Sequence, residues 1–258
     1  MKREIVKKII IALFFVIFTA IIMYCNFKIY NSSQFIADVG GFSAFLSVFG
    51  TLFGILSTLI LVEVWSQFNK TSNLMEEESV GLEKLYTSSL YFNDDPFSKK
   101  LKVSIIKYLE LVIKDDLQYM STGKRNKEAG EKFRDIIDVI KSIKFDDDHD
   151  SIIFDHIIRE FDNIFNVRAA RIEMGLSRIP TILKIFLYIA SFLLITSFVL
   201  MPFINIFYGI VISSFVSFLV VMIIQIINDL DNPYMGCWIL NNEAFKRALN
   251  HIENSYNK

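Results

Sequence analysis

The charged residues that could do chemistry in this chain stand beside long apolar runs. Arg168, Arg171 and Arg178 precede one run, and Asp229 and Asp231 follow the next. Such arginines usually anchor a membrane topology and contact anionic lipid, but they could also concentrate anions at a pore mouth. The aspartates could bind a cation or build the turn that takes the chain off the membrane. Because an unpaired carboxylate at a low-dielectric boundary is costly, we expect the aspartates to pair with the arginines in a polar cluster at the cytoplasmic face.

Other groupings of polar residues indicate no catalytic or metal site. Residues 146–150 read Asp-Asp-Asp-His-Asp but lack the spaced oxygen ligands and bidentate glutamate of a calcium loop, which favours a solvated acidic loop over a metal site. Glu76, Glu77 and Glu78 are interpreted as a solvated helix face. The three histidines do not have zinc-ligand spacing, and the chain has neither a phosphate-binding glycine loop nor a nucleophile motif. We therefore expect no enzyme activity, no cofactor and no metal.

Composition narrows the class of protein. Hydrophobic residues make up 53% of the chain and charged residues 21%, so the two kinds must be segregated along it. The 27 Lys and Arg residues are balanced by 28 Asp and Glu residues, which leaves no global field suited to nucleic acid. Two cysteines, Cys25 and Cys237, are too few for a disulfide framework and are interpreted as reduced, structural residues.

The apolar runs predict an all-α integral membrane protein with four transmembrane helices in two hairpins. Residues 9–27 and 39–62 carry no charge, and each run is long enough to cross a hydrocarbon core of about 30 Å. Residues 185–228 are also uncharged, but as one helix they would extend about 66 Å. The chain must therefore turn back within this run, and residues 201–205, which include Pro202, are where a helix would most readily stop.

The basic residues predict the orientation of these spans. Lys and Arg residues are concentrated at the N-terminus, before the third span and in the tail, whereas the predicted external loops hold only Lys28. By the positive-inside rule, both termini and the central region face the cytoplasm of a multi-pass protein of the cell membrane. The expected organisation is a first hairpin (1–65), a cytoplasmic helical domain (66–179), a second hairpin (180–228) and a cytoplasmic tail (229–258).

The central region has the periodicity of helices. Apolar residues recur at steps of three and four through residues 101–113 and 133–140. Asp95-Pro96 is typical of a helix start, because an oxygen acceptor caps the helix and proline presets the first dihedral. We expect breaks near residues 91–94, 121–127 and 145–150.

The second span carries two unlike stripes. Phenylalanines, among them Phe45, Phe49 and Phe53, fall on one stripe, and small residues, among them Gly50 and Gly54, fall on the other. The simpler interpretation is that the small residues let a neighbouring helix approach closely while the rings fill the bundle or meet lipid. The functional interpretation is that this helix lines a pore in which the Phe rings form a constriction that excludes water.

The chain resembles the uncharacterised bacterial bestrophin-like membrane proteins. The matching features are spread over most of the chain, and the most specific is Asp229-Leu230-Asp231-x-Pro233-x-x-Gly236 after the fourth span. The others are the second span running through Val64-Trp65 into an acidic helix, Tyr108-Leu109-x-x-Val112, and Arg168-x-x-Arg171 with Pro180. One departure is Asp115-Asp116-Leu117, where an acidic-Trp-Pro run is more typical, and it puts only a surface feature in doubt.

The resemblance implies kinship with pentameric anion channels whose second helix lines a neck of apolar rings, with Phe45, Phe49 and Phe53 as the nearest counterparts of that neck. The calcium-clasp acids of bestrophins have no match here. Two functions remain open: an oligomeric anion channel, or a membrane-anchored interaction or sensor protein whose cytoplasmic helices bind a partner. The expected partners are the lipid bilayer, further copies of the chain and an inorganic anion, and not nucleic acid.

Overall fold

The computed structural model describes residues 2–29, 38–92, 95–143 and 148–254, and these contain helices but no strand. Four helices are long and apolar enough to cross a membrane, as predicted. Three of them are α1 (Lys2–Ile29), α7 (Thr181–Leu200) and α8 (Ile206–Leu230). The fourth is the first half of α2 (Val39–Ser89), which continues for many residues beyond its apolar part.

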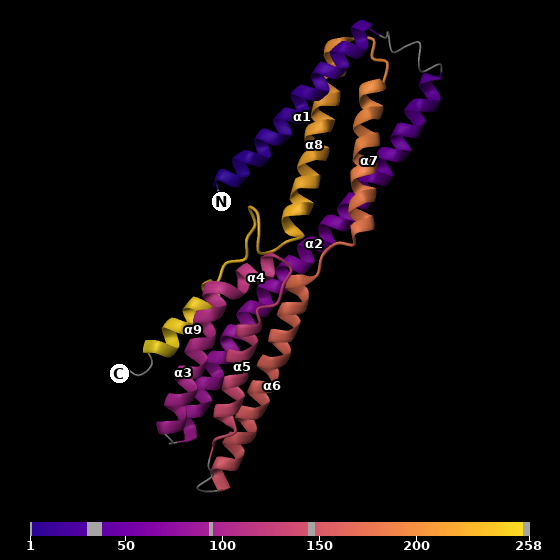
Figure 1. Cartoon of the computed structure of the whole chain (residues 1–258). Helices are drawn as coiled ribbons and strands as arrows, with labels where there is room; N and C mark the ends of the chain where they lie inside the picture. The colour runs from indigo at the N-terminus through magenta and orange to yellow at the C-terminus, as the bar shows by residue number, and fades with distance from the viewer. Residues whose placement is uncertain (1, 30–37, 93–94, 144–147, 255–258) are drawn as a thin grey trace. The chain divides into compact units, whose positions relative to one another are not determined.

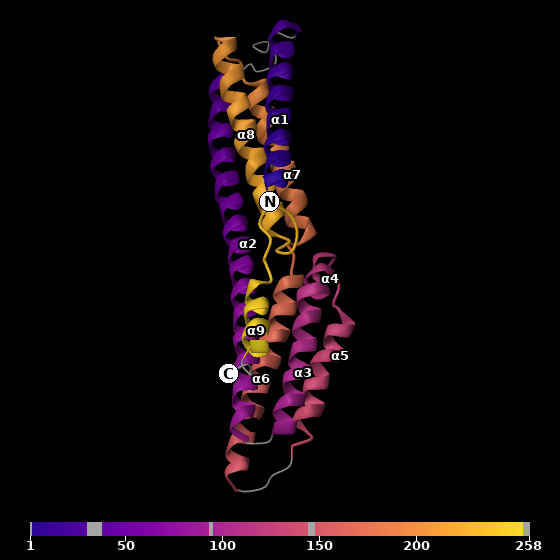
Figure 2. The same cartoon turned by 90° about the vertical axis from the view of Figure 1, so that its left-hand side faces the viewer.

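The described residues divide into two compact units. The membrane unit consists of residues 1–66, 178–231 and 236–238, and the polar unit consists of residues 67–177, 232–235 and 239–258. In the membrane unit, α1 packs against α8, and α7 contacts both. The helices of this unit can be followed in Figures 1 and 2. A Cβ atom at Gly50 of α2 would lie 4.0 Å from Leu194 Cδ1 of α7, an ordinary van der Waals separation.

The turn between α7 and α8 lies where the sequence predicts it. Helix α7 ends at Leu200, and α8 begins at Ile206 after the Met201–Asn205 segment that contains Pro202. The Asn205 side chain caps α8 by accepting hydrogen bonds from Phe207 N at 2.9 Å and Tyr208 N at 3.4 Å. An acceptor at this position satisfies amides that the first turn of a helix leaves without partners, so the break is encoded locally.

The polar unit is built from shorter amphipathic helices around one core. Its elements are the second half of α2, η2 (Leu90–Phe92), α3 (Asp95–Leu111), a π-helix (Val112–Asp116), α4 (Leu117–Ser121), α5 (Lys127–Ile140), α6 (Asp148–Leu176) and α9 (Glu243–Asn254). The apolar stripes of these helices meet in a core that includes Leu82, Tyr108 and Phe245. Gly81 allows α6 to approach α2 closely, since a Cβ atom there would lie 2.7 Å from Ile164 Cγ1.

Several local predictions for this region are confirmed. Helix α3 begins at the Asp95-Pro96 pair, and α5 begins at Lys127 after the expected break. The Asn126 side chain caps α5 by accepting a hydrogen bond from Glu128 N at 3.0 Å. The acidic segment 146–150 lies partly outside the described residues, and its side chains lie entirely outside them. The π-helix was not predicted, and it decides the position of one buried acidic residue, Asp116.

Candidate pore helix and ion-pair clusters

The first half of α2 has one packed side and one wide exposed side. Leu46, Phe53, Ser57 and Ile60 are buried against the membrane unit. The exposed side carries two adjacent stripes at helical spacing. One stripe is small and hydroxyl-bearing: Ser47, Thr51, Gly54 and Thr58; the other is aliphatic: Val48, Leu52, Ile55 and Leu59.

The three phenylalanines named as pore candidates lie between these two sides. Phe45 is 54% exposed and stacks on Phe49 with ring centroids 5.6 Å apart, whereas Phe53 is only 6% exposed. Gly54 has open space where a Cβ atom would stand, so the structure assigns it no packing partner within the described chain. The exposed surface of α2 is therefore formed by the small and aliphatic stripes together with Phe45. Phe49 is half-buried, and of the three phenylalanines only Phe53 is buried against the packed side.

At the far end of α8, Asp229 is held inside the turn that follows the helix. Its carboxylate accepts hydrogen bonds from Cys237 N at 3.0 Å and Trp238 N at 3.2 Å, and Lys8 Nζ lies 2.7 Å from Oδ1. Gly236 adopts φ +100°, and a Cβ atom there would collide with the Asp229 carboxylate. The glycine of the sequence motif is required because this close approach and this backbone angle both exclude a side chain.

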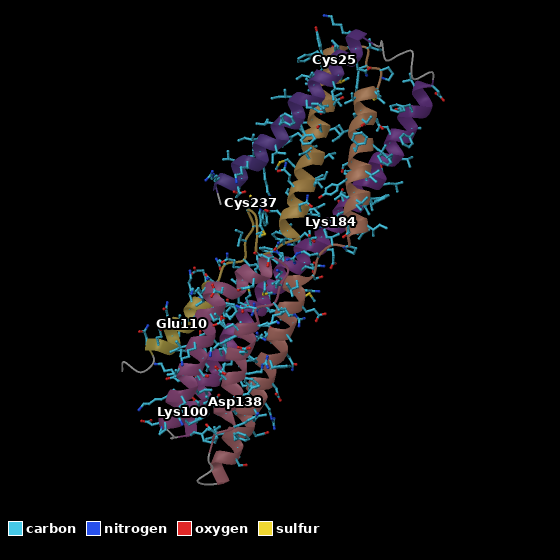
Figure 3. The ribbon with its side chains drawn as sticks, in the orientation of Figure 1. Cys25, Lys100, Glu110, Asp138, Lys184 and Cys237 are labelled. Atoms are coloured by element: carbon cyan, nitrogen blue, oxygen red, sulfur yellow. The ribbon has the colours of Figure 1, made fainter. Side chains whose placement is uncertain are left out.

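Asp231 makes a second set of polar contacts within the membrane unit. Its Oδ1 accepts a hydrogen bond from Ile179 N at 2.6 Å, and its Oδ2 pairs with Lys184 Nζ at 2.5 Å. The two contacts join the end of α8 to the segment that enters α7. Both cysteines are free: Cys237 is buried in this turn, and Cys25 is exposed at the other end of the unit (Figure 3).

The polar unit contains a fully buried ion cluster around Arg171 of α6. Arg171 Nε donates to Glu78 Oε2 of α2 at 2.6 Å, and Nη2 donates to Asp116 Oδ2 at 3.0 Å. Tyr108 of α3 donates its hydroxyl hydrogen to the other Glu78 oxygen and accepts a hydrogen bond from Arg168 Nε at 2.9 Å. The guanidinium of Arg171 has no exposed surface, and its planar fork allows it to serve two carboxylates at once.

The π-helix explains how Asp116 reaches this cluster. A π-turn inserts one extra residue per turn and shifts the helical face of the residues that follow it. Asp116, the last residue of the π-helix, is 2% exposed, whereas its neighbour Lys114 points to solvent. No periodic pattern of the sequence announces this shift, so a regular helix was the natural expectation.

Burial and charge change the acidity of the cluster. Burial opposes the charge on Arg171, but the carboxylates of Glu78 and Asp116 prevail and raise its pKa well above the usual value. Burial, together with the Glu78 carboxylate, also raises the pKa of Tyr108. Burial raises the pKa of Tyr234 to about 12, against the opposing effect of Arg171. The tyrosines therefore stay neutral and the arginine stays charged over the physiological range.

Three sequence interpretations need correction. Glu78 was interpreted as part of a solvated helix face, and Asp116 as part of a surface feature, but both are buried against Arg171. Arg171 was expected to anchor the chain at the lipid surface beside Asp229 or Asp231, whereas the ion pairs of those aspartates are with Lys8 and Lys184. A contact of Asp229 or Asp231 with Arg168 or Arg178 stays a prediction.

The remaining predicted residues occupy less constrained places. Arg168 is half-buried, and its guanidinium lies 4.8 Å from the Phe133 ring centroid. Arg178 is half-buried in the segment that precedes α7. Among the described residues, no group of three His, Cys, Asp or Glu side chains has the arrangement of a metal site.

Comparisons with known proteins agree with this architecture. A family model described as the bestrophin-like domain matches residues 11–245. The chain is similar to the crystal structure of a bacterial bestrophin homologue from Klebsiella pneumoniae, with 10% identity and a TM-score of 0.71 over 94% of this chain and 97% of that one. A single-residue variant of that homologue matches with 14% identity and a TM-score of 0.73 over 97% and 100% of the two chains. A comparison with curated protein sequences found no match.

Proposed function

We propose, from the premise that this chain belongs to the bestrophin-like family, that it is one subunit of an oligomeric anion channel in the cell membrane. The observation that carries the proposal is the wide exposed side of α2. Small residues such as Ser47, Thr51 and Gly54 on this side permit close approach of another helix. A helix that offers such a side after packing its other side within its own chain suits a position around an axis shared by several copies.

Different residues of α2 are candidates for lining the path, for contacts between copies and for the constriction. The hydroxyl-bearing stripe with Thr51 and the aliphatic stripe with Leu52 are exposed, so they are the first candidates to line the path and the contact between copies. Phe45 and Phe49 remain candidates for an apolar constriction that excludes water when narrow. Phe53 is buried in its own chain, and it would narrow the path only after its side chain moved.

The proposal is tested by anion flux into liposomes that contain the purified chain. If the exposed stripe of α2 lines the path, Thr51→Phe should reduce flux severalfold because a large ring enters a narrow passage. If the phenylalanine stripe forms the constriction, Phe49→Ala should instead raise basal flux. The matched control is Phe186→Ala, since Phe186 is an exposed phenylalanine of α7. Flux should not change in this variant.

Flux that equals that of empty liposomes in the wild type and in both α2 variants, with the oligomer intact, would overturn the channel. The membrane-anchored interaction protein would then be the better account. A monomer in detergent and in liposomes would overturn the shared axis itself.

The orientation of the chain is part of the same proposal. Lys2, Arg3, Lys7 and Lys8 precede the first span, and by the positive-inside rule both termini and the polar unit face the cytoplasm. A cysteine introduced at the exposed position Thr122, in a Cys25→Ser background, should react with an impermeant thiol reagent only after the cells are permeabilised. Reaction in intact cells would reverse the orientation.

A further inference from the structure

A cavity of about 370 Å³ lies in the polar unit beside the π-helix. It is bounded by the π-helix, α4 and the segment that leads into α9, and Tyr234 also lines it. The polar part of the lining consists of Lys114, Gln118, Ser121, Asn241 and Asn242, and the other lining residues apart from Tyr234 are aliphatic. Its volume is that of a site for a small molecule.

The charged residue that lines this cavity is positive. Among the described residues that line it, Lys114 is cationic and none is acidic. The nearest carboxylate to this ammonium is that of the neighbouring Asp115, at 4.0 Å, and the lysine side chain is largely exposed. An exposed ion pair of this length contributes little to stability, so the Lys114 ammonium can turn toward a bound anion.

The two asparagines are held in place by the backbone around the cavity. Asn242 Nδ2 donates to the carbonyl oxygen of Ile113, a residue of the π-helix, at 3.0 Å. Asn241 Oδ1 accepts from Glu243 N at 3.3 Å, which leaves its amide N–H groups to donate to a ligand. Fixed donors beside an apolar floor lower the cost of ordering a bound molecule.

The π-helix contacts the ion cluster on one side and the cavity on the other. It turns Asp116 inward to Arg171, and it presents Ile113 and Lys114 to the cavity. Single π-turns within helices are frequent at functional sites, because the added residue re-aims side chains. The cavity therefore lies beside an irregular helical turn whose inner side is occupied by the ion cluster. On the outer side Lys114 lies beside Asp115 and also lines a neighbouring hollow with Glu110 and Glu128, so a bound anion competes with these carboxylates for its ammonium.

We propose that this cavity binds a small organic anion, a carboxylate with an apolar body. The carboxylate meets the Lys114 ammonium and the Asn241 amide, and the apolar body lies on the aliphatic wall and the Tyr234 ring. This site is separate from the α2 face that carries the proposed channel function, and it does not depend on ion conduction.

The test uses 4-fluorobenzoate as the probe and the full chain in detergent micelles, with binding followed by broadening of the ¹⁹F resonance. Gln118→Trp should abolish the broadening, because an indole would fill the cavity from an exposed position. Lys114→Gln should weaken binding by roughly fivefold, the effect of one exposed charge contact. The matched control is Lys100→Gln, because Lys100 is an exposed lysine near the start of α3 (Figure 3). The residues that line the cavity follow the other end of that helix in the chain.

Lys100→Gln should bind the probe as the wild type does, and neutral 4-fluorobenzamide should bind more weakly than the benzoate. Broadening that equals that of empty micelles would overturn the proposal. Broadening that persists in Gln118→Trp and Lys114→Gln would place the probe elsewhere, for example in a pore, and would also overturn it. Equal binding of the benzamide would overturn the preference for an anion. Failure of any of these leaves the liposome flux of the channel proposal unaffected, so the two are distinguishable.

Discussion

The two units solve the problem of buried charge in different ways. In the polar unit, Arg171 and its carboxylate partners are all buried, and each depends on the others for compensation. In the membrane unit, Asp229 and Asp231 are buried, but their lysines remain 25% and 28% exposed, and backbone N–H groups supply further hydrogen bonds. Removing one member of a fully buried ion cluster leaves an uncompensated buried charge and destabilises the fold. A carboxylate that also accepts hydrogen bonds from backbone N–H groups tolerates the loss of its lysine.

The largest effect is expected when the closed cluster is broken. Arg171→Leu would leave Glu78 and Asp116 buried without a cation, which costs about 3–5 kcal/mol of unfolding free energy. For a chain of this size the melting temperature should fall by roughly 10 °C, as measured by the thermal loss of the monodisperse size-exclusion peak.

The matched control for this variant is Arg247→Leu. Arg247 pairs with Glu76, two residues before Glu78 on α2, at 2.7 Å, but both of these side chains are at least half exposed. Removing a surface pair changes stability by about 0–1 kcal/mol. Equal losses in the two arginine variants would show that burial of the Arg171 cluster carries no special energetic weight.

A second, smaller effect concerns alkaline pH. The pKa of Tyr234 is raised to about 12 in the folded chain from 10.0, so the folded state keeps a proton that the unfolded state releases. The contribution of Tyr234 to the free energy of unfolding is therefore fully present below pH 10. It falls by roughly 3 kcal/mol as the pH rises through about 12. Tyr234→Phe cannot lose this proton, so its melting temperature should fall less steeply between these two pH values. Parallel slopes for wild type and variant would contradict the assignment.

The smallest effect is expected when either partner of the Lys8–Asp229 pair in the membrane unit is removed. Asp229→Ala would leave the amides of Cys237 and Trp238 without their acceptor, at a cost of about 1–3 kcal/mol for the buried groups. Lys8→Met removes only the partly exposed ammonium and should cost about 1 kcal/mol or less. Thermal stability in the same assay compares them, and a larger loss for Lys8→Met would mean that the lysine, not the backbone, holds the carboxylate.

Much of the membrane unit could be predicted because its signals are local. A span is a matter of length and apolarity, so the uncharged runs indicated four helices. The break before α8 followed from the segment 201–205 that contains Pro202. In the polar unit, the start of α3 followed from an equally local signal, Asp95-Pro96. The glycine after Asp229 also belongs to a motif visible in the sequence, although its reason, a positive φ beside a carboxylate, required coordinates.

The partners of the charged residues could not be predicted in the same way. Arg171, Glu78 and Asp116 come from α6, α2 and the π-helix, and their pairing depends on which faces of distant segments meet. The π-helix changes the face of Asp116 without any signal in hydrophobic periodicity.

The sequence by itself determined the number of spans, the helical class, the turn between α7 and α8 and the family, because these depend on composition, local caps and short motifs. Only the tertiary structure decided that Arg171 is a buried core residue, that Phe53 is packed and that Ser47, Thr51 and Gly54 are exposed. The physical reason is that burial and charge compensation are properties of contacts between segments far apart in the chain, and hydropathy along the chain does not encode those contacts.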